Sequence, residues 1–333
     1  MARQQGRPVG ITGIGMYVPE RVLTNQDLER IVDTSDEWIV TRTGIRERRI
    51  AGPEESTFTM ALAASRQALE MAGVRPEEID LIVVGTVTPD MIFPSTAALL
   101  QEALGASRAA AVDISAACPG FVYGITLAGQ TIASGLYRTV LVVGAETLSR
   151  ITDYQDRNTC VLFGDAAGAA VLQPVREGYG LLASILGSDG SGAEHLYLPG
   201  GGSRHPASHE TVDKRMHYIR MNGKEVFKFA VRVMNESTVQ VLEEAGHTVA
   251  DLDLLVPHQA NIRIIEAAVE RLGIPWEKVV VNLDRYGNTS TATIPVALYE
   301  ALQAGRIRDG DLLVLVSFGA GLVWGATALR WGR

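Results

Sequence analysis

Three residues in this sequence have types and neighbours suited to thiolate chemistry. Cys118 follows a strand-like segment and three small residues, and it precedes Pro119, a residue favoured in the first turn of a helix. A thiol at a helix N-terminus faces the positive end of the helix dipole, which favours the thiolate and lowers its pKa. His258 ends the apolar run 254–257, and Asn288 lies in the same half of the chain. A cysteine with histidine and asparagine partners is the pattern of nucleophilic catalysis.

The other thiol and histidines favour ordinary structural roles. Cys160 sits in an apolar segment and is predicted to be a buried, inert thiol. The remaining five histidines lie in polar surroundings and are expected to face solvent: His195, His205, His209, His217 and His247. A buried, unreactive cysteine and a core histidine are the corresponding alternatives for Cys118 and His258.

Alternating segments predict an α/β fold with largely parallel sheets. Continuous apolar runs are typical of strands that are covered on both faces; they occupy 80–85, 138–144, 253–256 and 311–317. Amphipathic stretches that mostly end near a glycine predict helices; they occupy 57–73, 119–134, 223–246, 261–273 and 291–304.

The chain contains an internal repeat. The segment that begins at Gly135 resembles the one that begins at Gly305, 170 positions later, and the strand at 80–85 resembles the one at 253–256, with an offset of 173. Chance similarity between strands is the alternative, but two matches in the same order favour two copies of one α/β unit. We expect halves at 1–175 and 176–333. Cys118 and Asn288 each precede the repeated glycine by 17 positions, so they occupy equivalent places.

Composition excludes several classes of protein. The 333 residues are 47% hydrophobic and 20% charged, with a net charge of −8, which describes a soluble globular chain and argues against disorder and nucleic-acid binding. No apolar run reaches the ~18–20 residues of a membrane span, and the start has no secretory h-region, so we expect a cytoplasmic protein without membrane contact. No zinc-type spacing of His and Cys predicts a metal site. The glycines at 319–325 have too little chain after them for a dinucleotide fold.

Six segments together resemble β-ketoacyl-[acyl-carrier-protein] synthase III, and they cover nearly the whole chain in that family's order: 33–48, 113–123, 163–170, 257–263, 286–290 and 318–321. The resemblance implies an enzyme with the thiolase fold, in which duplicated α/β halves form a five-layered αβαβα arrangement, and a homodimer. It also implies an acyltransferase that starts fatty acid synthesis from acetyl-CoA or a short or branched acyl-CoA.

The resemblance further implies a decarboxylative Claisen condensation without a cofactor, in which acyl-CoA is a substrate. Cys118 takes the acyl group, and the backbone N–H groups of Cys118 and Ala320 hold the oxyanion. Malonyl-acyl-carrier-protein then loses carbon dioxide, and His258 and Asn288 stabilise the enolate.

The family also implies a CoA channel. Trp38 and Arg157 would sandwich the adenine, and other channel positions match Thr34, Arg42, Gly223, Phe227, Lys228 and Arg263. Arg263 and Lys228 would also contact the acyl carrier protein. Phe93 matches a residue that reaches the acyl pocket across the dimer interface.

Two departures from the family pattern are visible. Ala320 replaces the middle glycine of a family triplet, and Glu270 stands at a position that is often basic, which affects the expected carrier-protein footprint. The alternatives are a ketosynthase or acyltransferase of polyketide or other secondary metabolism and a non-catalytic assembly partner. A 3-hydroxy-3-methylglutaryl-CoA synthase is disfavoured because segment 93–96 lacks a glutamate.

Overall fold

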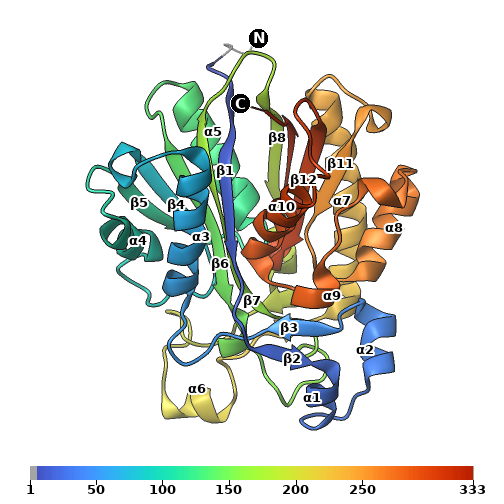
Figure 1. Cartoon of the computed structure of the whole chain (residues 1–333). Coiled ribbons are helices and arrows are strands. Elements are labelled where there is room, and N and C mark those ends of the chain that lie inside the picture. The colour runs from blue at the N-terminus through green and yellow to red at the C-terminus, as the bar shows by residue number, and fades with distance from the viewer. Residues whose placement is uncertain (1–5, 333) are drawn as a thin grey trace.

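Two β-sheets organise the computed structural model, which describes residues 6–332 (Figure 1). In spatial order, the first sheet contains β1 (Val9–Tyr17), β7 (Asp165–Pro174), β6 (Val140–Thr147), β4 (Leu81–Gly85) and β5 (Ala110–Ile114). The second contains β8 (Gly180–Ser188), β13 (Val323–Arg330), β12 (Leu312–Gly319) and β11 (Leu254–Pro257).

The two sheets repeat one topology, as the sequence predicts, but each mixes antiparallel and parallel pairs, so the expectation of largely parallel sheets is wrong. Strands buried on both faces are apolar in either direction, so the apolar runs do not distinguish the two pairings. In the first, β1, β7 and β6 pair antiparallel, and β6, β4 and β5 pair parallel. In the second, β8, β13 and β12 pair antiparallel, β12 and β11 pair parallel, and Val279 bridges to β11 in the place of a fifth strand. We propose a boundary between the halves at 175/176, since β7 ends at Pro174 and β8 begins at Gly180.

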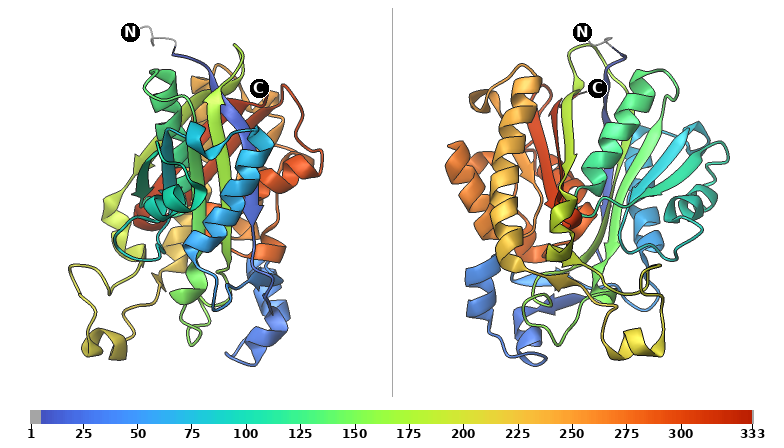
Figure 2. Two further views of the ribbon diagram at one scale, coloured as in Figure 1. Left: turned by 60° about the vertical axis from the view of Figure 1, so that its left-hand side comes forward. Right: turned by 180° about the vertical axis from the view of Figure 1, so that it is seen from behind.

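Six helices complete five layers. The central layer holds α5 (Gly120–Ala133) and α10 (Thr293–Gln303), which contact strands of both sheets. One outer layer holds α3 (Thr57–Ala72) and α4 (Thr96–Leu104), and the other holds α7 (Gly223–Glu244) and α8 (Ile262–Leu272). Figures 1 and 2 show the outer pairs on opposite flanks of the two sheets. The predicted αβαβα arrangement is therefore confirmed.

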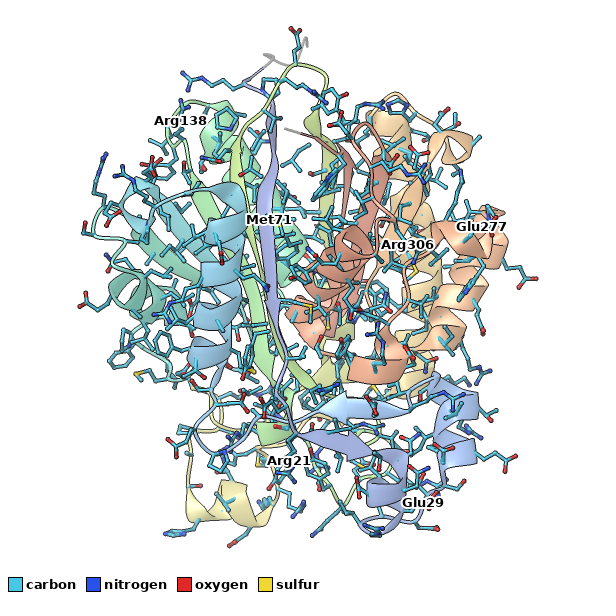
Figure 3. All side chains as sticks on the ribbon, viewed as in Figure 1. Arg21, Glu29, Met71, Arg138, Glu277 and Arg306 are labelled. Carbon is cyan, nitrogen blue, oxygen red and sulfur yellow. The ribbon has the colours of Figure 1, made fainter. Side chains whose placement is uncertain are left out.

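Both faces of the central strands are buried, which explains their unbroken apolar sequences. Every residue of β6 and β12 is buried. In Figure 3, Met71 lies between α3 and β1, while labelled charged residues such as Arg138 and Arg306 lie on the outside. Among residues 6–332, no helix has the length and apolarity needed to cross a membrane.

Three glycines form a flat floor under the central helices. Gly85, Gly144 and Gly168 are cross-strand neighbours on β4, β6 and β7. A Cβ on these glycines would lie 2.8 Å from the Gly120 carbonyl carbon, 2.4 Å from the Thr291 carbonyl oxygen and 2.6 Å from the Pro295 Cβ, respectively. Because the floor has no side chains, the starts of both central helices approach the sheet closely.

Short elements lie below the layered body in Figure 1. Those labelled below the body are β2 (Val22–Thr24), α1 (Asn25–Glu29), α2 (Asp36–Thr43), β3 (Glu47–Arg49) and α6 (His209–Asp213). Further short elements are β9 (Leu196–Tyr197), β10 (Arg220–Met221) and α9 (Leu283–Tyr286). The fully buried Arg48 ties this region together, since its guanidinium donates to the Leu23 and Val161 carbonyls and to Asn25 Oδ1. These elements flank the carboxyl ends of the parallel strands, where ligands bind in open α/β sheets.

Candidate active site

Cys118 lies in the turn between β5 and α5. The preceding residue, Ala117, has a φ of 49°, and a Cβ on Gly319 would lie 2.8 Å from the Cys118 nitrogen, so the turn is packed tightly against the end of β12. Burial raises the pKa of the thiol to about 12, although a hydrogen bond with Ser290 lowers it and nearby Glu146 raises it. The direction is opposite to the lowering expected from the sequence, because desolvation of the buried thiolate is the largest influence on this pKa.

His258 follows β11 and is 1% exposed. Its backbone N–H donates to the Val316 carbonyl at 2.8 Å, and its ring meets the edge of Phe318 at a centroid distance of 5.1 Å. Nδ1 lies 2.7 Å from the Thr293 hydroxyl. Burial lowers the pKa of the ring to about 3, so at neutral pH His258 is an uncharged hydrogen-bonding group.

Asn288 precedes α10 and the 3₁₀ turn Ser290–Ala292. Its backbone pairs with the segment around Phe163, donating to the Leu162 carbonyl at 2.8 Å and accepting from the Gly164 N–H at 3.0 Å. The side-chain Oδ1 accepts the Ser290 N–H at 2.9 Å. Because Oδ1 is engaged in this bond, the Nδ2 hydrogens are the group that Asn288 can offer a ligand.

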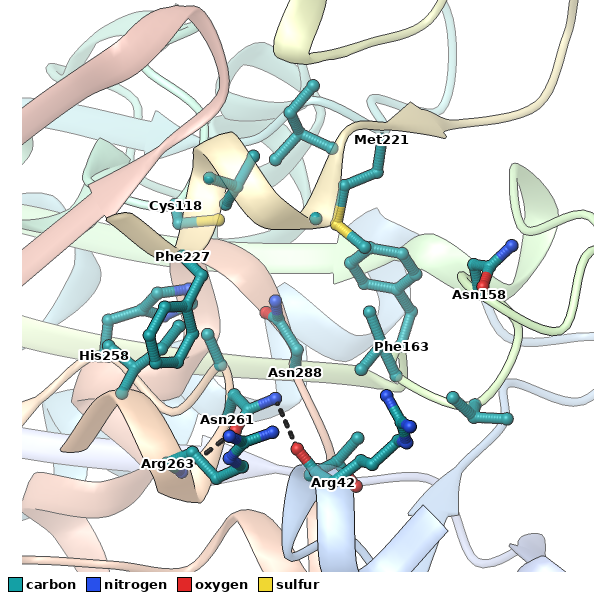
Figure 4. Close-up of a pocket in the computed structure, with 18 of the residues that line it drawn as sticks. Arg42, Cys118, Asn158, Phe163, Met221, Phe227, His258, Asn261, Arg263 and Asn288 are labelled. Carbon is teal, nitrogen blue, oxygen red and sulfur yellow. Dashed lines mark hydrogen bonds between the residues drawn. The ribbon is translucent and has the colours of Figure 1, made fainter. Parts of the chain in front are cut away.

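One cavity of about 410 Å³ brings these three residues together (Figure 4). Cys118, His258 and Asn288 are buried, whereas the lining cations Arg42, Lys224 and Arg263 are exposed. The cavity therefore extends from a cationic surface to a buried thiol. Such a site suits an acyl group whose carrier is anionic.

Five predicted channel residues line this cavity directly, namely Trp38, Arg42, Gly223, Phe227 and Arg263. The Trp38 ring has the Arg157 guanidinium 4.5 Å from its centroid, and Arg157 also pairs with Asp33 at 3.5 Å. Since a base does not fit in that 4.5 Å gap, an adenine sandwich requires Arg157 to swing away from the indole.

Other predicted residues lie outside the lining. Thr34 is half-buried, and its hydroxyl has no hydrogen-bond partner within residues 6–332. Lys228 is exposed and pairs with Glu225 at 2.9 Å, while Lys224, one turn earlier, lines the cavity. Gly319 rather than Ala320 forms the wall beside Cys118. Phe93 is 82% exposed on the surface.

Sequence reasoning missed the residues that support the site. Glu146 is fully buried at the end of β6 and accepts hydrogen bonds from the Ser290 and Thr291 hydroxyls and from the Val87 and Thr88 N–H groups. An acid that follows an apolar strand was a usable signal for it. The apolar wall had no such signal; it includes Val161, Leu162, Phe163, Leu196, Met221, Val226 and Phe318. No group of His, Cys, Asp and Glu within residues 6–332 could hold a metal.

Comparisons with known proteins agree with this geometry. Two family models match: 3-oxoacyl-[acyl-carrier-protein (ACP)] synthase III over residues 112–190, and its C-terminal model over residues 242–331. The chain is 71% identical to a β-ketoacyl-[acyl-carrier-protein] synthase III of Symbiobacterium thermophilum, covering 98% of this chain and 99% of the relative. It is 58% identical to the synthase III of Caldanaerobacter subterraneus, covering 97% and 98%.

Solved structures show the same likeness. The crystal structure of 3-oxoacyl-[acyl-carrier-protein] synthase III from Aquifex aeolicus is 50% identical with a TM-score of 0.91, covering 97% of this chain and 100% of that one. A priming β-ketosynthase from the R1128 polyketide pathway is 38% identical with a TM-score of 0.91, covering 100% and 99%.

Proposed function

This chain belongs to the β-ketoacyl-[acyl-carrier-protein] synthase III family, and we propose that it works through an acyl thioester on Cys118. It is an acyltransferase that initiates fatty acid synthesis by condensing a primer acyl group with malonyl-acyl-carrier-protein. The polyketide alternative is not favoured, because identity to the polyketide ketosynthase is well below identity to the two synthase III relatives.

In the first half-reaction, the Cys118 sulfur attacks the thioester carbonyl of acyl-CoA. The S–acyl bond to Cys118 forms, the bond to CoA sulfur breaks, and the cysteine proton ends on the CoA thiol. The backbone N–H groups of Cys118 and Gly319 are our candidates for the oxyanion donors. Gly319 takes the place that the family resemblance gave to Ala320, because Gly319 lines the cavity beside Cys118.

In the second half-reaction, malonyl-acyl-carrier-protein loses carbon dioxide and leaves a thioester enolate. His258 Nε2–H and Asn288 Nδ2–H donate to the enolate oxygen, and its carbon attacks the acyl group. The new C–C bond forms as the Cys118 thioester breaks, which releases a 3-oxoacyl-carrier-protein and a Cys118 thiolate. The thiolate takes up one proton from water and returns to the resting thiol. A neutral His258 suits this role, since a neutral imidazole still offers one N–H.

The observation that carries this proposal is the convergence of Cys118, His258 and Asn288 on one cavity with an apolar wall and an exposed cationic rim. The test is intact-protein mass spectrometry after incubation with a panel of acyl-CoAs, with Cys118→Ser as control. We expect an acyl adduct on the wild type alone, and the adduct will also identify the primer. No adduct with any acyl-CoA would refute the proposal.

The roles of the two donors are tested separately with His258→Ala and Asn288→Ala. Loss of one such donor costs about 3 kcal/mol of transition-state stabilisation, so each variant should lose condensation while it still acylates Cys118. Wild-type condensation in both variants would contradict these assignments.

We further propose that Trp38, Arg157 and Thr34 contact CoA. Arg42, Lys224 and Arg263 would bind the phosphates of CoA or of the acyl carrier protein. Lys228 would contact the carrier protein. Exposed cations at the rim support the assignment, because both partners are anionic. We expect no cofactor beyond the substrates. The two buried free thiols, Cys118 and Cys160, fit a reducing cytoplasm.

A homodimer is proposed on the evidence of one exposed edge. β5 is the last strand of its sheet, and its Val112 is 44% exposed. Nearby in the chain, Ile92 is 84% exposed and Phe93 is 82% exposed, which is unusual for large apolar side chains. Pairing of two β5 edges would cover these side chains and bring Phe93 to the partner's acyl pocket.

A further inference from the structure

We propose that Thr293 is a positioning residue that donates its hydroxyl hydrogen to Nδ1 of His258 and so holds the ring as the neutral tautomer with its proton on Nε2. The proposal rests on the function proposed above, in which His258 Nε2–H donates to the enolate oxygen. It assigns to Thr293 the role of keeping the His258 Nε2–H available as a donor.

The contact is short and buried. Thr293 Oγ1 lies 2.7 Å from His258 Nδ1, and the two residues are 2% and 1% exposed. In the described part of the chain, this hydroxyl is the hydrogen-bond partner of the ring. In a neutral imidazole, the bond that one nitrogen makes determines which nitrogen carries the proton. Thr293 is therefore placed to choose the tautomer.

Two acceptors compete for the single hydroxyl hydrogen of Thr293. One is His258 Nδ1, and the other is the Ser290 carbonyl at 2.9 Å. The Ser290 carbonyl also accepts the backbone N–H of Thr293, so it stays paired when the hydroxyl turns to His258. If the hydroxyl instead bonded to Ser290, Nδ1 would carry the proton and an Nε2 lone pair would face the enolate oxygen. Two lone pairs repel each other, so the proposed arrangement is the one that stabilises the enolate.

The choice of tautomer matters because the His258 ring is not doubly protonated. Burial lowers the pKa of His258 to about 3, which leaves one ring proton at neutral pH. Glu146, the buried carboxyl beside this turn, accepts hydrogen bonds from the Ser290 and Thr291 hydroxyls. The position of the single proton therefore decides whether His258 donates or accepts.

The same turn also orients the second donor. Ser290 N–H binds Asn288 Oδ1 and leaves Nδ2 for the substrate, and Thr293 acts three residues later on His258. Ser290 has a φ of 49°, a left-handed conformation that its bonds to Asn288 and Glu146 hold in place. One turn thus positions both donors of the second half-reaction.

The test uses the full-length protein and three variants. Thr293→Val removes the hydroxyl and keeps the shape, whereas Thr293→Ser keeps the hydroxyl. Thr238→Val is the matched control, because Thr238 is also buried in a helix and its hydroxyl bonds only to the Met234 carbonyl at 2.7 Å. Cys118 acylation by the acyl-CoA panel described above is followed by intact mass, and decarboxylation by release of carbon dioxide from malonyl-acyl-carrier-protein.

We expect Thr293→Val to lower decarboxylation by about tenfold, by analogy with the ~10- to 100-fold cost of removing the partner that orients a metal-bound histidine. Acylation should fall far less, Thr293→Ser should recover most of the lost rate, and Thr238→Val should match the wild type. Nitrogen-15 NMR of the imidazoles, with His258 assigned by its absence from His258→Ala, should show the proton on Nε2 and a hydrogen-bonded Nδ1 in the wild type.

Three results would overturn the proposal: a wild-type proton on Nδ1, wild-type decarboxylation by Thr293→Val, or equal losses in Thr293→Val and Thr293→Ser. If Thr293→Val does not fold, the wild-type spectrum and the Thr293→Ser variant still test the proposal. A proton on His258 Nδ1, or a large loss of decarboxylation in the serine variant, would contradict it. A wild type that neither acylates Cys118 nor decarboxylates the malonyl thioester refutes the proposed function instead, and the spectrum distinguishes the two failures.

Discussion

Gly144→Ala is expected to impair condensation by moving the turn Ser290–Ala292, which adjoins Asn288 and Thr293 and so helps to orient the proposed enolate donors. Gly144 lies in β6 at the centre of the glycine floor, directly under the turn Ser290–Ala292. A Cβ at this position would be 2.4 Å from the Thr291 carbonyl oxygen and 2.8 Å from its carbonyl carbon. Both atoms belong to the backbone, so no side-chain rotation can relieve the contact.

The size of the effect follows from that distance. Contacts of a Cβ below 3.0 Å are essentially never seen, so the Thr291 carbonyl must move by at least about 0.6 Å. A misplacement of about 1 Å in a catalytic group can cost ~100-fold in rate, so we expect condensation to fall by roughly 10- to 100-fold. The added methyl should also lower the free energy of unfolding by ~1–3 kcal/mol, the usual cost of overpacking.

The assay compares the two half-reactions in the purified variant. Condensation with malonyl-acyl-carrier-protein should fall more than acylation of Cys118, because the three atoms nearest to the new methyl all belong to Thr291. Gly202→Ala is the control, since a Cβ on Gly202 meets nothing within 4 Å. A folded Gly144→Ala enzyme that condenses at the wild-type rate would refute this reasoning, as would an equal loss in the Gly202 variant.

Three further predictions concern charge, substrate binding and assembly. Burial raises the pKa of Glu146 from 4.5 to about 6, so the folded chain binds this proton more tightly than the unfolded chain does. The free energy of unfolding should therefore fall by about 2 kcal/mol in total as pH rises from about 3.5 to about 7, most steeply between the two pKa values. Denaturant titrations of Glu146→Gln should lack that part of the fall, and identical pH slopes would contradict the shift. Trp38→Ala should raise KM for acyl-CoA about tenfold, because stacking on a base contributes ~1–3 kcal/mol. Trp276→Ala is the control, since Trp276 is exposed and lies outside the cavity, and its KM should not change. An unchanged KM in both variants would exclude Trp38 from the CoA site. Val112→Glu should convert a dimer to a monomer in light scattering, whereas exposed Ile31→Glu should not, and a dimeric Val112 variant would remove β5 from the interface.

The duplicated fold was predictable because both of the patterns that indicate it can be read directly from the sequence. Apolar runs report strands buried on two faces, and the repeated offset reports two copies of one unit. The same offset paired Cys118 with Asn288, and the structure gives each residue the same setting. Each follows a residue with positive φ, Ala117 at 49° and Gly287 at 62°, and each precedes a central helix.

The details that sequence could not supply depend on packing between distant segments. Lys224 and Lys228 lie one turn apart near the start of α7, so periodicity cannot tell which one reaches the cavity. Gly319 and Ala320 are adjacent small residues, and only the course of β12 decides which faces Cys118. The raised pKa of Cys118 is likewise a result of burial, which a helix-terminus argument from local sequence does not include.

The duplication gives a physical reason for where the two chemical steps occur. Both central helices begin at the cavity, so the positive ends of two helix dipoles meet where the acyl oxyanion and the enolate develop negative charge. The cationic side chains that line the cavity, Arg42, Lys224 and Arg263, are exposed at its rim, and burial keeps Cys118 a thiol at rest. At the base of the cavity, negative charge would therefore be favoured only on the acyl oxyanion and the enolate oxygen, at which the proposed N–H donors point. In the proposed mechanism, this arrangement would stabilise the transition states more than a resting thiolate, which is the differential binding that catalysis requires.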